Sequence, residues 1–270
     1  MQMPNGNYSP EHLHYLWQQR LKALCVRGAQ LLLLVGFFVL WEVAASKGWI
    51  NGFIFSQPSR IWAATLRLAT EGQLWKHLGW TVWETVLGFS VGTAAGILVA
   101  VLLWWSTFIS DVMDPYIVLL NSVPKVALGP IFVVWLGTTI TAVVVMAISV
   151  SIIVTIMMMH TGFKEVDPNK IKLVRTFGGS KAQVLFKVII PASIPTMIAA
   201  LKVNVGLSLV GTIVGEFLAS KAGLGYLIVY GGQVFNMSLV MASVLLLLVV
   251  SVILYYAVTL LEQRVSRGGA

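Results

Sequence analysis

The chain contains a series of apolar runs about 20 residues long, the length that a helix needs to cross about 30 Å of hydrocarbon. Only 10% of its 270 residues are charged and 58% are apolar, whereas soluble domains carry about 25% charged residues. The sequence therefore predicts an all-α polytopic membrane protein with no separate soluble domain. We predict six transmembrane helices, at 28–46, 79–104, 114–136, 139–159, 197–217 and 237–261.

The segments that flank the first span are too polar to cross a membrane. The run from Gly28 to Ser46 lacks a small-residue cleavage site, so we expect it to remain as an anchor. Residues 51–77 do not form a span; Ser56-Gln57-Pro58 begins a short helix that we expect in the outer interface. The predicted organisation is a cytoplasmic segment over 1–27, a transmembrane domain over 28–264 and a cytoplasmic tail over 265–270.

Basic residues fall unevenly on the two sides that six spans create. One side holds eleven and the other five. The positive-inside rule places the richer side in the cytoplasm, together with both termini and the loops 105–113 and 160–196. The richer side holds Arg20, Lys22, Arg27, Lys164, Lys170, Lys172, Arg175, Lys181, Lys187, Arg264 and Arg267; the other holds Lys47, Arg60, Arg67, Lys76 and Lys221.

The loop 160–196 has more internal pattern than a simple connection requires. Gly178-Gly179 divides it into two short helical pieces, Ser180 can cap the second piece, and Pro191 and Pro195 end it. The apolar residues Leu173, Val174 and Phe177 could anchor a partner protein, with Lys172 and Arg175 facing an acidic rim. The alternative is that the basic loop lies on anionic lipid.

Glycines recur every fourth residue in the second span, at Gly88, Gly92 and Gly96. Such spacing lets two helices approach closely. We predict close packing at this stripe, within the bundle or across a dimer.

A few polar residues lie inside or at the ends of the spans and are candidates for a transport pathway. Lys125 stands between Pro124 and Pro130, which interrupt the third span. Asn121, Asn204 and Ser208 could line the pathway, or could form hydrogen bonds between helices instead.

Two acidic residues lie at the ends of predicted spans. Glu216 ends the fifth span at the outer side, where it is either a gate or packing contact or an exposed helix end. Glu84, at the start of the second span, is expected to be solvated.

The sequence contains no recognisable catalytic or metal-binding pattern. There is no Gly-x-x-x-x-Gly-Lys-Ser/Thr loop, the four histidines lack metal-ligand spacing, and neither a Ser/His/Asp set nor paired carboxylates are indicated. We therefore predict no catalytic residue, metal site or cofactor in this chain, and no nucleic-acid partner. Energy must come from an ion gradient or from a partner, and the lack of carboxylates at mid-membrane depth disfavours an ion symporter.

Three segments together resemble the permease subunit of bacterial ATP-binding-cassette (ABC) importers, in the group that handles nitrate, sulfonates, taurine, bicarbonate or pyrimidine-type vitamin precursors. The resemblance covers about residues 55 to 264, with a family core over about 79–261. The segments are Pro124-Lys125-Val126-Ala127-Leu128-Gly129-Pro130 running on to Trp135-Leu136-Gly137; Val174-Arg175-Thr176-Phe177-Gly178-Gly179-Ser180 with Val188, Ile190, Pro191 and Pro195; and Gly215-Glu216-Phe217 with Gly223-Leu224-Gly225.

The resemblance implies a type I importer permease in the bacterial inner membrane. Two permease copies, expected to be identical, would form the pathway, and an extracytoplasmic binding protein would deliver the substrate. Cytoplasmic subunits would bind ATP and Mg and grip the loop helices. The expected coupling residues are Asp167, Lys172, Leu173, Val174, Arg175, Thr176, Phe177, Gly178, Gly179 and Ser180.

The chain departs from the family pattern at two places. Lys172-Leu173-Val174 stands where the family often has Glu-Ala-Ala, and Glu84 stands where it often has Arg. The first change removes a glutamate contact to the partner. The competing functions are an ion-coupled secondary transporter that works without an ATPase, and a membrane scaffold with no transport role.

Overall fold

The computed structural model describes residues 10–267, which form helices and no strand. The described chain divides into two compact units, Met1–Ala63 and Ala64–Ala270. The ends of the predicted terminal segments, 1–9 and 268–270, lie outside the described residues.

The first unit consists of α1 (Pro10–Ser46), α2 (Gly52–Phe55) and the beginning of α3 (Pro58–Thr70). α1 begins well before the span predicted from residue 28, because Leu, Gln, Lys and Ala in the polar segment are good helix formers. The short helix predicted after Ser56-Gln57-Pro58 is confirmed as α3. Its first turn is held by Glu42, whose carboxylate accepts hydrogen bonds from the Ser59 N–H (2.9 Å) and hydroxyl (2.8 Å).

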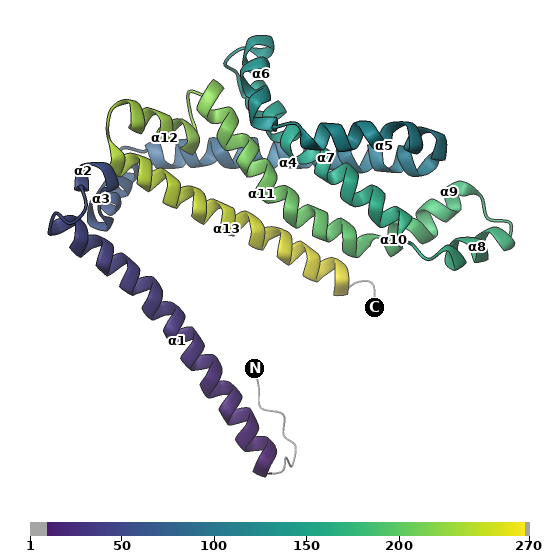
Figure 1. Ribbon diagram of the computed structural model, residues 1–270, viewed down its shortest axis with the longest axis horizontal. Coiled ribbons are helices and arrows are strands. Elements are labelled where there is room, and N and C mark those ends of the chain that lie inside the picture. The colour runs from purple at the N-terminus through teal and green to yellow at the C-terminus, as the bar shows by residue number, and fades with distance from the viewer. Residues whose placement is uncertain (1–9, 268–270) are drawn as a thin grey trace. The chain divides into compact units, whose positions relative to one another are not determined.

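The second unit contains the remaining helices, in which α8 and α9 lie at one end and α6 and α12 at the other (Figure 1). The elements are α4 (Gln73–Trp105), α5 (Thr107–Ser122), a 3-10 helix (Lys125–Leu128), α6 (Gly129–Leu136), α7 (Ile140–Lys164), α8 (Pro168–Thr176), α9 (Lys181–Val184), a π-helical turn (Leu185–Ile189), α10 (Ile190–Ala192), α11 (Ile194–Ala219), α12 (Leu224–Gln233) and α13 (Met237–Arg267).

Five described helices are long and apolar enough to cross a membrane, and a sixth span exists if α5 and the segment Lys125–Leu136 are counted together. That pair is bent by 85°, so the third predicted span, 114–136, is not a straight helix. The bend follows from Pro124, since a residue before proline avoids the helical region, and Val123 has an extended ψ of 129°.

α7 is the central helix of the second unit and packs most extensively against α4 and α11. On the α4 side, a Cβ at Gly88 would lie 2.5 Å from Ala147, and one at Gly92 would lie 2.7 Å from the Ser151 hydroxyl. On the α11 side, a Cβ at Gly211 would lie 2.6 Å from the Ala147 Cα. The close packing predicted for the α4 glycines is therefore confirmed within the chain.

The N-terminus of α12 is capped by side chains from two other helices, an arrangement that we call the α12 cap. Since the N-cap residue is Gly223, the first turn has no side chain of its own to accept from its backbone N–H groups. The Gly223, Leu224 and Gly225 N–H groups donate instead to His77 Nδ1 (3.0 Å), Thr81 Oγ1 (2.8 Å) and Glu216 Oε2 (2.5 Å).

We predict that Gly211→Ala lowers the stability of the solubilised protein by about 1–3 kcal/mol, because the new methyl group meets backbone that cannot move aside. The matched control is Gly206→Ala on the same helix, where a Cβ has no atom within 4 Å. This control should leave stability unchanged or raise it slightly, since alanine favours helix. The melting temperatures of both variants in detergent check the prediction, and equal effects would contradict it.

Thr81→Val should destabilise the protein by about 1–3 kcal/mol, because it leaves the Leu224 N–H without its acceptor and removes the hydroxyl that donates to Glu216 Oε1. Thr85 lies one turn further along α4 and is equally buried, but its hydroxyl donates only to the Thr81 carbonyl. Thr85→Val should therefore cost much less. The measurement is the melting temperature of the two variants in parallel. An equal loss of stability would show that the α12 cap does not stabilise the protein.

Candidate functional site

The polar loop that follows α7 folds into two short helices separated by Gly178-Gly179, as predicted. α8 is capped by Asp167, whose side chain accepts from the Asn169 N–H at 2.9 Å. The predicted Ser180 cap of α9 is confirmed as a reciprocal pair with Gln183, at 3.3 and 2.7 Å. Gly178 has φ of +78°, which explains why glycine occupies the turn.

The loop is shorter than the predicted 160–196, because α7 continues to Lys164 and α11 already begins at Ile194. Pro191 and Pro195 do not end the helical structure. Pro195 lies in the first turn of α11, where its missing N–H costs nothing, and Pro191 lies in α10, directly after the π-helical turn.

Two large apolar side chains of the loop are exposed to solvent. Phe177 is 83% exposed and Leu173 is 59% exposed, and Lys172 and Arg175 are exposed beside them. Val174 packs instead against the buried cluster that includes Phe163. Our grouping of Val174 with the exposed anchor was therefore wrong, because this position faces the bundle.

The second half of the loop is attached to the end of α4 through Lys181. Its ammonium group donates to the carbonyl oxygen of Trp105 at 2.5 Å. It also lies 5.8 Å from the ring centre of Trp104 and 5.7 Å from that of Trp105. A lysine thereby satisfies a carbonyl that the helix C-terminus leaves without an intrahelical partner.

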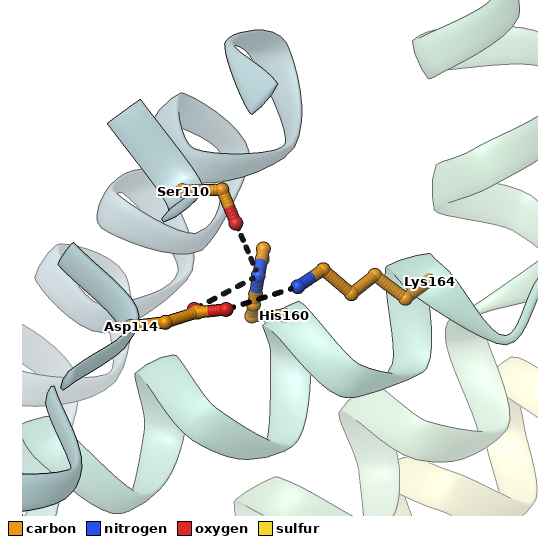
Figure 2. A network of polar contacts seen from close by, with 4 residues as sticks. All are labelled: Ser110, Asp114, His160 and Lys164. Atoms are coloured by element: carbon orange, nitrogen blue, oxygen red, sulfur yellow. Dashed lines mark hydrogen bonds and ion pairs between the residues drawn. The ribbon is translucent and has the colours of Figure 1, made fainter. Parts of the chain in front are cut away.

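A polar network attaches the end of α7, just before the loop, to α5 (Figure 2). His160 Nε2 lies 2.9 Å from the Ser110 hydroxyl and 3.7 Å from the Asp114 carboxylate, and Lys164 contacts the same carboxylate at 3.4 Å. This is not a hydrolytic triad, since serine and aspartate meet the same ring nitrogen. The sequence did not reveal the network, because its two halves are 50 residues apart.

The candidate pathway residues do not form one site. Asn121 and Lys125 meet at the bend, where the Lys125 ammonium donates to the Asn121 carbonyl at 2.9 Å. Asn204 is fully buried and donates to Thr155 (2.6 Å) and Thr93 (3.2 Å), so it joins α11 to α7 and α4. Ser208 is equally buried on the same helix. The interhelical hydrogen bonds considered for Asn204 are therefore present.

The two glutamates lie together inside the protein, and each is only 1% exposed. Glu216 belongs to the α12 cap and also accepts from the Thr81 hydroxyl at 2.6 Å, so it is not an exposed helix end. Our expectation that Glu84 is solvated was wrong, because α11 and the segment after it cover this part of α4. The side chains interact, forming a carboxyl pair that sequence reasoning missed across a separation of 132 residues.

Comparison with known proteins identifies the family. Residues 92–267 match the family described as the binding-protein-dependent transport system inner membrane component. A probable ABC transporter permease protein from Haemophilus influenzae is 30% identical, covering 86% of this chain and 95% of that protein. A putative aliphatic sulfonates transport permease protein and a taurine transport system permease protein, both from Escherichia coli, are 26% and 24% identical and match 90% and 95% of this chain, covering 92% and 95% of their own lengths.

Among solved structures, a chain of the MetNI methionine ABC transporter in an inward-facing conformation matches 79% of this chain and 99% of its own length, with a TM-score of 0.57 and 20% identity. This likeness confirms the predicted type I permease fold. Permeases of this family work with ATP-binding subunits and substrate-binding proteins. The chain belongs to the binding-protein-dependent transport family and is the inner-membrane permease component of an ABC importer.

Proposed function

We propose that this chain forms half of a translocation pathway for a small organic nutrient, driven by ATP hydrolysis in a separate subunit that grips α8 and α9. An organic sulfonate or taurine is the favoured substrate class, because two relatives are described as permeases for aliphatic sulfonates and for taurine. The family match favours this function over an ion-coupled secondary transporter, since the family is defined by dependence on a binding protein.

The main support for this proposal is the exposed apolar surface of the loop. Phe177 and Leu173 stay in solvent on a turn that is otherwise fixed by caps and by a left-handed glycine. Protein interfaces commonly depend on one or two apolar anchors that become buried in a partner's groove. Lys172 and Arg175 beside them suit an acidic rim on that partner, in place of the glutamate that the family often has.

The attachments of the loop provide a physical route for the motion. A push on the loop reaches α4 through the Lys181–Trp105 contact and reaches α5 and α7 through the His160 network. Because α4, α7 and α11 are closely packed, they move as a body rather than deforming. ATP binding in the partner would thereby change access to the pathway.

The remaining components of the importer are proposed from the likeness to the family. The partner supplies ATP and Mg binding, and this chain is proposed to hold no cofactor. A second copy of the chain completes the pathway as a homodimer. The organisation proposed for the chain is a cytoplasmic N-terminal segment, the transmembrane domain with its coupling loop, and a short cytoplasmic tail.

Phe177→Ala should weaken the complex with the ATP-binding subunit by about tenfold, because loss of a buried aromatic anchor costs more than 1 kcal/mol. The tagged chain is extracted from its host in mild detergent, and the co-purifying polypeptide with a P-loop is identified and quantified. Trp75→Ala removes a comparably exposed aromatic (70%) at the other end of α4 and serves as the control. Full retention of the subunit by Phe177→Ala would contradict the proposed docking surface.

Gly178→Pro should abolish substrate-stimulated ATP hydrolysis and uptake while leaving membrane insertion intact, because proline cannot adopt the φ of +78° found here. Gly178→Asn is the matched control, since asparagine tolerates the left-handed region, and should retain most of the activity. Uptake and ATPase rates in proteoliposomes provide the measurement. Normal uptake by the proline variant would show that the turn does not transmit motion.

A further inference from the structure

A cavity of about 480 Å³ lies at the α12 end of the second unit. It is lined by the first turns of α4, the beginning of α7 and the segment that follows α11, and it is partly open to solvent. Lys76, Trp80 and Glu84 stand four residues apart on α4, so they line the cavity from one face of that helix. Lys76 and Lys221 are exposed, and Glu84 is buried about 12 Å from Lys76 along the helix axis.

Glu84 has a buried oxygen that nothing in the described chain satisfies. Its Oε2 atom has no hydrogen-bond partner among the described residues, although leaving a buried carboxyl oxygen unpaired is costly. Glu216 interacts with Glu84, but its own oxygens already accept from Thr81 and Gly225, and Glu84 Oε2 is still left without a partner among the described residues. Two adjacent carboxylates repel each other, so this pair favours a positive charge supplied from the cavity.

We propose that this cavity binds a small zwitterion, with its ammonium group on Glu84 and its sulfonate or carboxylate group near Lys76 and Lys221. The inference rests on the proposed function and places a substrate contact at the outer end of the pathway. Trp80 lies one turn from Glu84 and also lines the cavity, so that an aromatic ring is available close to the same cation. With the anionic end held by the two lysines, the cationic end can extend toward Glu84.

A metal ion fits the cavity less well than an ammonium group. The described residues contain no group of three His, Cys, Asp or Glu side chains that could hold a metal. A hydrogen-bonding cation matches the single unsatisfied oxygen of Glu84, since a charge-assisted hydrogen bond needs one acceptor rather than a full coordination shell. A proton held between Glu84 and Glu216 is the remaining alternative, and it requires no ligand.

Equilibrium dialysis tests the proposal on the chain in complex with its ATP-binding subunits, reconstituted in nanodiscs without the binding protein. The probes are radiolabelled taurine and β-alanine, with ethanesulfonate and ethylamine as competitors that each lack one charge. At least one zwitterion should bind, and each competitor should bind at least tenfold more weakly. Glu84→Gln keeps the shape and should weaken zwitterion binding at least tenfold, whereas Glu71→Gln, outside the cavity, should change nothing.

Three results would overturn the proposal: neither zwitterion binds, ethanesulfonate binds as well as taurine, or Glu84→Gln binds like the wild type. Higher stability of Glu84→Gln without any zwitterion binding would identify a shared proton instead, which also overturns it. If Glu84→Gln does not fold, Lys221→Ala takes its place and should reduce taurine binding but not ethylamine binding. Co-purification of the ATP-binding subunits tests the importer separately, so a complex that assembles without binding zwitterions refutes only this inference.

Discussion

The close approach of α7 to α4 and α11 is the constraint on which the rest of this structure depends. In lipid, helices gain nothing from burying apolar surface against each other rather than against acyl chains, so their association needs intimate contact. The α4 glycines and Gly211 supply that contact, because their missing side chains admit the α7 backbone. Asn204 adds hydrogen bonds from α11 to both other helices.

The three packed helices α4, α7 and α11 have a different set of polar contacts at each end. At one end the α12 cap fixes a short helix through His77, Thr81 and Glu216. At the other end the loop that carries α8 and α9 is connected to α4 by Lys181 and, through α7, to α5 by the His160 network. Because the helices between them pack closely at the glycine contacts, the proposed coupling would carry a displacement of the loop along these helices.

The sequence predicted the site well where local rules decide the structure. The helix break at Gly178-Gly179 and the Ser180 cap depend on residues within a few positions of each other, and both are present. The sequence did not predict contacts between segments that are distant in the chain. Val174 faces the bundle and Glu84 is buried beside Glu216 because of helices that lie far away in the chain. The bend after α5 was indicated by Pro124, but its 85° angle was not.

By itself, the sequence determined a multi-span helical membrane protein, its short loop helices and the resemblance that names its family. These follow from the length of apolar runs, from backbone preferences and from motifs, which are properties of contiguous residues. Only the tertiary structure decided which polar groups satisfy one another: the carboxyl pair, the α12 cap and the network around His160. Burial makes such pairing obligatory, but the partners are chosen by helix packing across 50 to 146 residues.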